Sequence, residues 1–218
     1  FLIFSFSCSK FEKKDSKNGN NEKIKDKKEI SIIGVGDIML GSNYPNEDLL
    51  PNTNILQNVE SILQNADITA GNLEGTLFDK GGDPKKCENP SVCYVFRMPS
   101  KYGKYLKNAG FDYLSLANNH SNDFGEVGIL QTMENLNSLG IKYSGIKEKA
   151  EYSILEKDGI KYGFVSFAPN SKTVDINDYE YASNLIKSVK EKSDIVVVFF
   201  HGGAEGKEHE HITRNNEI

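Results

Sequence analysis

The sequence lacks an excess of positive charge, a long apolar run and a cysteine-rich pattern, and each absence excludes a class of protein. Its 218 residues carry 26 Lys and Arg against 31 Asp and Glu, which gives a net charge of −5. Proteins that bind duplex nucleic acid usually present a basic face, so nucleic acid is not expected as a partner. The apolar run within residues 1–8 is too short to span a bilayer. What remains is a globular chain long enough for one sizeable core.

The glycines near the first expected strand do not form a nucleotide-binding motif. Gly34, Gly36 and Gly41 are not spaced as G-x-G-x-x-G. Ser42 follows Gly41 at the point where a P-loop would continue with Lys and then Ser or Thr. A dinucleotide site and a P-loop are therefore both excluded by the spacing.

The first residues are expected to direct export. Residues 1–9 begin inside an apolar stretch without an initiator Met, which indicates a clipped signal sequence. Cys8 follows small and apolar residues, and this resembles the lipobox of bacterial lipoproteins, in which the cysteine carries the lipid. The alternative is a truncated secretory signal with an incidental cysteine. The first interpretation predicts a cell-envelope lipoprotein held to the membrane by its lipid, and the second a secreted or periplasmic soluble protein.

The next segment is a linker, and the folded domain follows it. Residues 10–29 contain eight lysines and five acidic residues and show no apolar periodicity. Such a composition predicts a disordered, basic tether. We therefore assign one domain to residues 30–218, more acidic than the chain as a whole.

The two remaining cysteines lie in one loop. Cys87 and Cys93 are six residues apart in "KKCENPSVCYVF". In an exported protein, a disulfide that closes this loop is expected. A structural zinc is disfavoured because no second Cys or His pair lies nearby.

Strand-like and helix-like segments alternate along the domain, which predicts an α/β fold with a mainly parallel sheet covered by helices. The Asp-Gly pair in residues 156–163 indicates a hairpin, and the apolar residues before His201 predict a fully buried strand. The expected strands are 30–35, 66–75, 111–119 and 194–203, and the expected helices are 54–65, 100–110, 125–140 and 178–193.

Unusual polar residues fall where these strands end. Asp37 follows the first strand, Asn72 and Glu74 end the second, Asn118, Asn119 and His120 end the third, and His201 ends the last. Ligands bind at the carboxyl ends of strands in open α/β sheets, so these side chains are expected to converge. Carboxylate, amide and imidazole donors without thiolate suit Mn, Fe, Zn or Mg.

Each residue also has a structural interpretation. Asp37 could cap a turn, Glu74 could be an exposed turn residue, and the Asn-Asn-His sequence could be a hydrogen-bonded loop corner. A histidine at a strand end, such as His201, is often structural. Their common position at one sheet edge favours a site. His209 and His211 form a His-x-His pair, for which we favour a solvated surface stretch.

Five motifs occur together in one order: "GDIMLG", "NLEG", "FRMP", "LANNHSNDFG" and "HGG". The sequence from about Ile30 onward thereby resembles the CapA type of bacterial capsule-synthesis proteins. These are associated with poly-γ-glutamate and belong to the metallophosphatase (calcineurin-like) superfamily. The resemblance implies a four-layer α/β/β/α sandwich with a two-metal centre at the strand ends.

The resemblance also implies roles for particular residues. Asp37, Asn119 and His201 match metal ligands, and Glu74 stands where the superfamily has its bridging aspartate, with Asn72 beside it. His120 matches the histidine that protonates the leaving oxygen or stabilises charge in the transition state, held by Asp123 or a neighbour. Asn118 and Asp123 would keep the loop in shape. Arg97 could bind an anionic substrate oxygen, or could be an ordinary surface arginine.

Two departures from the superfamily pattern affect these expectations. Asp37-Ile38-Met39 lacks the imidazole of the Asp-x-His motif, and no Gly-His-x-(Pro)-His motif is present. The resemblance therefore implies a fragment that lacks the C-terminal metal-binding histidines.

The expected function is that of a poly-γ-glutamate capsule-biosynthesis protein with a metal-dependent, phosphoesterase-like site that uses two divalent metal ions. Its partners would be an anionic substrate, either a phosphoester or poly-γ-glutamate, and a capsule-synthesis complex. The alternative is a non-catalytic surface lipoprotein or assembly factor that uses the same fold for binding.

Overall fold

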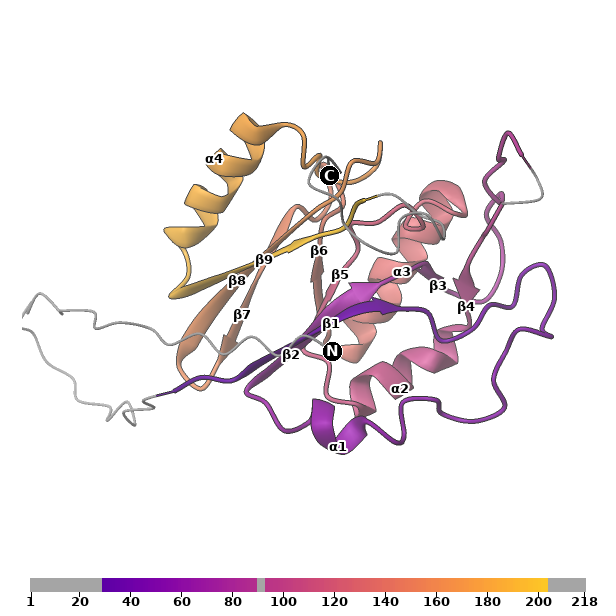
Figure 1. Cartoon of the computed structure of the whole chain (residues 1–218), viewed down its shortest axis with the longest axis horizontal. Helices are drawn as coiled ribbons and strands as arrows, with labels where there is room; N and C mark the ends of the chain where they lie inside the picture. The colour runs from indigo at the N-terminus through magenta and orange to yellow at the C-terminus, as the bar shows by residue number, and fades with distance from the viewer. Residues whose placement is uncertain (1–28, 90–92, 204–218) are drawn as a thin grey trace, which may run out of the picture.

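The structure is a computed structural model that describes residues 29–89 and 93–203 (Figure 1). The elements in chain order are β1 (Ile32–Ile38), α1 (Glu60–Leu63), β2 (Ile68–Leu73), β3 (Thr76–Leu77), β4 (Arg97–Met98), the 3₁₀ helix η2 (Ser100–Tyr102), α2 (Gly103–Asn108), β5 (Tyr113–Ser115), α3 (Gly125–Leu139), β6 (Lys142–Ser144), β7 (Tyr152–Lys157), β8 (Ile160–Phe167), α4 (Tyr179–Lys190) and β9 (Ile195–Phe200).

The first sheet is parallel throughout. Its strand order is β1-β2-β5-β6, and each neighbouring pair runs in the same direction. Every residue of β2 is buried, as a central strand with both faces covered requires. The parallel sheet predicted from the strand–helix alternation is confirmed.

The second sheet has the order β7-β8-β9. Its antiparallel β7–β8 hairpin turns at Asp158 and Gly159, which both have positive φ (54° and 76°), as a tight hairpin turn requires. β9 pairs in parallel with β8. The prediction that β9 is fully buried is wrong, because within the described residues β9 is an edge strand. Val198 is 45% exposed and Phe200 is 63% exposed.

Three apolar clusters separate four layers. Leu106, Ile129 and Leu136 of α2 and α3 pack on one face of the first sheet. The other face contributes Ile68, Ala70 and Tyr113 to a cluster with the second sheet. The far face of the second sheet packs against α4 through Val165, Leu185 and Val189. Figure 1 shows this sequence of layers, and the expected α/β/β/α sandwich is confirmed.

The helices differ from their predicted bounds in two places. Residues 54–65 form only one short helix, α1, because Asn54 begins the segment with a turn in which its side chain accepts a hydrogen bond from Leu56 N. Residues 100–108 divide into η2 and α2. The other two helices match closely. α3 ends at Gly140 with φ 66°, and Asp178 caps α4 by accepting from Tyr181 N.

Tyr113 links the two sheets through its hydroxyl group. The hydroxyl contacts Ser144 Oγ of β6 at 2.6 Å and also Ser166 of β8. Its ring stacks on Phe164 at 4.1 Å between centroids. Burial raises the pKa of Tyr113 to about 12.

This pKa predicts a loss of stability in alkaline solution. The unfolded chain releases the tyrosine proton near pH 10, whereas the folded protein retains it up to about pH 12. The unfolded state then binds fewer protons, so the free energy of unfolding should fall by about 1.4 kcal/mol per pH unit across this interval. Urea unfolding of the wild type and Tyr113→Phe between pH 9 and 12 measures the difference in slope. Tyr179→Phe, at an exposed tyrosine, should keep the wild-type slope, and equal slopes in all three proteins would contradict the assignment.

No helix among the described residues is long and apolar enough to cross a membrane. Cys87 and Cys93 form a disulfide, with their Cα atoms 5.6 Å apart. Cys8 and the residues expected to form the signal sequence lie outside the described residues.

Candidate metal centre at the strand ends

Strand register brings the polar strand ends together. Asp37 near the end of β1 pairs with Asn72 of β2, and Asn72 pairs with Ser115 of β5. The loop that follows β5 carries Asn118–Asp123. His201 follows β9 in the other sheet, and its backbone N–H donates to Phe167 O. The candidate site therefore takes residues from both sheets.

Asp37, Glu74 and His201 form a candidate metal-binding group, because each offers one ligand atom and these atoms lie within 4.8 Å of one another. Asn119, the fourth predicted ligand, is beside them, with its Oδ1 3.0 Å from His201 Nε2. Two ligands of one zinc-sized ion, each at about 2.0–2.2 Å, can be no more than about 4.4 Å apart. Side-chain shifts of a few tenths of an ångström would close the group around one ion, so the residues fit a divalent cation.

Asn72 orients both carboxylates. Its Nδ2 donates to Asp37 Oδ1 and to Glu74 Oε2, each at 2.7 Å. Its Oδ1 accepts from Asn118 Nδ2 at 3.0 Å, and Asn118 also donates to Leu73 O at 2.8 Å. The two asparagines are thus arranged to support the ligands, as outer residues of metal sites commonly do.

The two carboxyl groups differ in their electrostatic surroundings. Burial raises the pKa of Glu74 above its usual value, and the positive charge of His201 only partly opposes this. The hydrogen bond with His201 lowers the pKa of Asp37, which is the more exposed of the two. A bound cation would favour the ionised form of Glu74, which burial alone disfavours.

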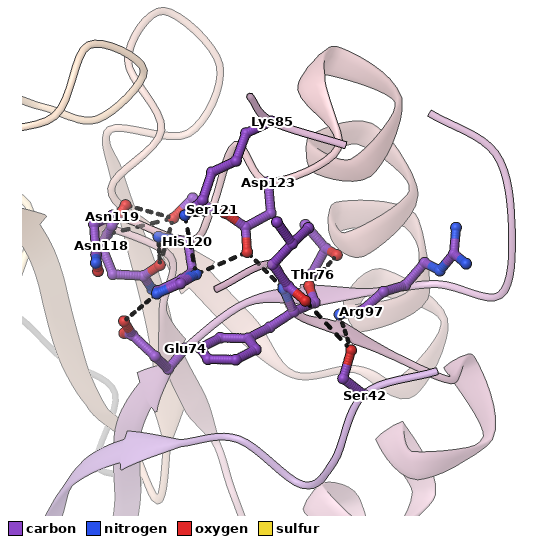
Figure 2. Close-up of polar contacts among 12 residues, drawn as sticks. Ser42, Glu74, Thr76, Lys85, Arg97, Asn118, Asn119, His120, Ser121 and Asp123 are labelled. Carbon is purple, nitrogen blue, oxygen red and sulfur yellow. Dashed lines mark hydrogen bonds and ion pairs between the residues drawn. The ribbon is translucent and has the colours of Figure 1, made fainter. Parts of the chain in front are cut away.

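His120 lies beside this group and is held on three sides. Its Nδ1 is 2.7 Å from Asp123 Oδ2, its ring stacks on Phe96 at 4.2 Å, and its Nε2 is 4.0 Å from Glu74 Oε1. Its backbone N–H donates to Asn118 Oδ1. Figure 2 shows the imidazole between Glu74 and Asp123. With Nδ1–H donated to Asp123, Nε2 is the ring atom turned toward the candidate metal ligands.

Asp123 has no exposed surface and joins three parts of the chain. Besides His120, its carboxylate accepts from Phe96 N at 2.6 Å and pairs with Lys85 Nζ at 2.6 Å. Lys85 Nζ is also 3.3 Å from His120 Nδ1. Asp123 thus contacts His120, Phe96 and Lys85, and its role in holding this loop stays a prediction.

Lys85 and Phe96 were not identified from the sequence. Both residues lie in loops and not at the carboxyl end of a strand, so the argument from strand ends could not identify them. Phe96 is itself the first residue of the "FRMP" motif, but the interpretation of that motif singled out Arg97.

Arg97 lies apart from the candidate metal ligands. Its Nε donates to Asn43 Oδ1 at 2.6 Å, and its guanidinium lies over the Phe124 ring at 4.7 Å. Figure 2 shows the side chain directed away from His120 and Glu74. His209 and His211 lie outside the described residues.

Comparison with known proteins finds two similar sequences and one similar solved structure. The CapA protein of poly-γ-glutamate (PGA) biosynthesis from Bacillus subtilis is 28% identical over 192 residues, which cover 81% of this chain and 50% of that protein. The capsule biosynthesis protein CapA of Bacillus anthracis is 28% identical over 58% of this chain and 30% of that protein. Among solved structures, a phosphatase from Mycoplasma pneumoniae has a TM-score of 0.45 at 20% identity, with 78% of this chain and 54% of that chain covered. The chain thus spans about half the length of the Bacillus subtilis relative.

The family assignment rests on a match over most of the chain. The model of the family described as bacterial capsule synthesis protein PGA_cap matches residues 31–215. This range contains the strand-end residues and every motif on which the CapA-type resemblance was based. The chain therefore belongs to the bacterial capsule synthesis protein PGA_cap family.

Proposed function

We propose that this chain carries a metal-dependent hydrolytic site of the phosphoesterase type. The supporting observation is the convergence of Asp37, Glu74 and His201, whose ligand atoms lie within 4.8 Å of one another. His120 adds a proton-exchanging group beside them, with its Nε2 4.0 Å from Glu74. Metal ligands and an oriented imidazole are the two components that such hydrolysis requires.

Each residue of the site would have a separate role in hydrolysis. Asp37, Glu74, His201 and Asn119 would hold a divalent cation, which supplies Lewis-acid stabilisation and an activated water when bound. Asn72 fixes the direction of both carboxylates through its two 2.7 Å hydrogen bonds. In the form with a proton on each ring nitrogen, His120 would give the Nε2 proton to the leaving oxygen and become the neutral Nδ1–H imidazole. Asp123 would keep the other ring proton on Nδ1 and so leave Nε2 for the substrate. A second ion, as in the superfamily, is part of this proposal.

A second candidate function is suggested by the family. Its description refers to capsule synthesis, and the Bacillus subtilis relative is a protein of PGA biosynthesis. The site would then bind or process an anionic capsule polymer, within a capsule-synthesis complex. A lipid on Cys8 would place the protein at the cell envelope.

Removing the metal tests the first proposal. The full-length protein, as purified and after chelation with EDTA, is assayed for divalent metals per chain and for hydrolysis of bis(4-nitrophenyl) phosphate. We expect chelation to lower the rate by more than about 100-fold, since loss of an outer supporting residue alone typically costs 10–100-fold. Added Mn²⁺ or Zn²⁺ should restore the rate. A rate of hydrolysis that is unchanged by EDTA would refute a metal-dependent site. Release of glutamate from the polymer, without phosphodiester hydrolysis, would favour the second candidate.

A further inference from the structure

A cavity of about 130 Å³ lies beside the candidate metal centre. It shares Asn118, Asn119 and Ser121 with the loop that carries His120. A buried water needs roughly 10–15 Å³ of such space, so the cavity can hold a group of several atoms. Its lining residues are Lys85, Asn118, Asn119, Ser121, Asn122, Asn170, Ser171, Lys172 and Thr173.

The lining of this cavity is basic although the protein is acidic. It contains two lysines and no carboxylate, whereas the whole chain has a net charge of −5. Lys85 is neutralised by Asp123 at 2.6 Å. Lys172 forms no ion pair with any residue in the described ranges. The cavity therefore offers an ammonium group that is not already compensated, next to amide and hydroxyl groups.

The walls of the cavity are held by backbone contacts. Lys172 O accepts from Lys147 N at 3.0 Å, and Thr173 Oγ1 donates to Ala168 O at 2.8 Å. Elsewhere in the lining, Ser121 Oγ hydrogen-bonds the backbone and the side-chain oxygens of Asn118. The polar groups are thus positioned in advance, which reduces the entropy lost when a ligand binds.

Two of the lining residues have unsatisfied polar atoms. Asn122 Oδ1 and Asn170 Oδ1 are buried without a hydrogen-bond partner. Such atoms are uncommon in folded proteins and mark places where a ligand or water completes the hydrogen bonding. Because an amide can be turned by half a rotation, each group could instead present its NH₂ donor to an anion.

We propose that this cavity binds an oxyanion, a carboxylate or phosphate group, carried by the molecule whose reacting bond lies at the candidate metal centre. Binding of the oxyanion follows from the cavity itself, whereas its attachment to a substrate rests on the proposed hydrolytic function. Lys172 supplies the charge, and the turned amides of Asn122 and Asn170 with the Ser171 hydroxyl supply hydrogen bonds. Lys85 lies between the cavity and His120, so an anion here would lie within a few side chains of the reacting group. The cavity would then select substrates with a second negative charge.

Anion binding to metal-free protein tests this assignment without catalysis. Full-length protein treated with EDTA is titrated calorimetrically with inorganic phosphate and, separately, with the dipeptide γ-glutamylglutamate. We expect Lys172→Met to weaken binding of the preferred probe by about tenfold or more, the usual effect of losing a hydrogen bond to a charged group. Because Lys172 is exposed, its replacement should leave the fold intact.

Lys107→Met is the matched control. Lys107 is also exposed and lines a cavity, but that cavity lies at the amino end of β2 and β5. Its variant should bind both probes within about twofold of the wild type, since the same charge is lost at a distant place. The probe that binds more tightly shows whether the cavity prefers a phosphate or a carboxylate group.

Three outcomes would overturn the proposal. Neither probe binds, or both variants weaken binding equally, or binding appears only after metal is added and is unchanged by Lys172→Met. In the last case the anion lies at the metal centre. If anion binding depends on Lys172 but the protein has no hydrolytic activity, the proposal of an anion site in the cavity stands and the proposal of a hydrolytic function is refuted. The two proposals can therefore fail separately.

Discussion

Replacing Glu74 with Gln is expected to remove metal binding and to lower hydrolysis by more than about 100-fold. Glu74 is the buried carboxylate of the candidate group, and loss of an outer supporting residue alone typically costs 10–100-fold. Gln keeps an oxygen that can accept from Asn72 Nδ2, so the supporting hydrogen bond survives. What is lost is the negative charge that a cation requires.

Stability measurements separate this effect from unfolding. Burial raises the pKa of Glu74, so its ionised form is disfavoured and the neutral amide should leave the metal-free protein at least as stable. A metal at 100 times its Kd should stabilise the wild type by about 2.7 kcal/mol but should leave Glu74→Gln nearly unchanged. Thermal unfolding with and without Mn²⁺ measures this difference.

Glu134→Gln provides the control, since Glu134 is an exposed residue of α3. It should retain both the metal-dependent stabilisation and the activity. A Glu74→Gln protein that binds and responds to metal like the wild type would exclude Glu74 as a ligand.

Replacing Asp123 with Asn is expected to damage both stability and catalysis. Asp123 is completely buried and joins Lys85, Phe96 N and His120. Breaking a buried ion pair by removing one partner typically costs 3–5 kcal/mol. Lys85 is partly exposed and can reach water, so we expect about 3 kcal/mol, measured by urea unfolding.

The catalytic loss has a different cause. An Asn amide turned toward His120 would donate to Nδ1, so Nδ1 could not carry a proton. This would disfavour the form of His120 with protons on both ring nitrogens, which is the form that gives up its Nε2 proton. Oriented acid–base groups typically contribute about 10²–10⁴-fold to rate, and kcat should fall within this range. Metal content should stay at the wild-type level, because Asp123 is not among the proposed ligands. The ring nitrogen chemical shifts of His120 report the tautomer directly.

A second aspartate gives a comparison for this variant. Asp79 also accepts two hydrogen bonds, from Ser100 N and Oγ, and these lower its pKa, but it is exposed. Asp79→Asn should destabilise the protein by no more than about 1 kcal/mol and keep kcat. If Asp123→Asn behaved like Asp79→Asn, the buried carboxylate would have no special part in holding His120.

The strand-end residues could be predicted because their positions follow from the sheet itself. Parallel strands bring their carboxyl ends to one edge, so Asp37, Asn72 and the loop after β5 had to lie together. The four layers could not be read from the same pattern and came from the family resemblance. Periodicity shows which residues are apolar, but not which sheet a strand joins.

The missed features depend on contacts between distant segments. Lys85 forms an ion pair with Asp123, but both residues lie in loops, and no local sequence pattern specifies the path of these loops. The exposure of β9 was missed for a related reason, since an apolar strand has the same sequence in the middle of a sheet and at its edge. The cavity between Lys85 and Lys172 likewise exists only after two loops have come together.

The origin of the candidate ligands in two sheets bears on how the chain folds. Asp37 lies near the end of the first described strand and His201 follows the last, so nearly the entire described domain lies between them in sequence. Contacts between such distant residues form only after the intervening chain is ordered, because closing a long loop costs entropy in advance. A cation that needs both residues would therefore be bound by the finished sandwich and not by a partly folded or cleaved chain. Metal binding would then report that folding is complete, and molecules that are partly folded or cleaved would have no hydrolytic activity.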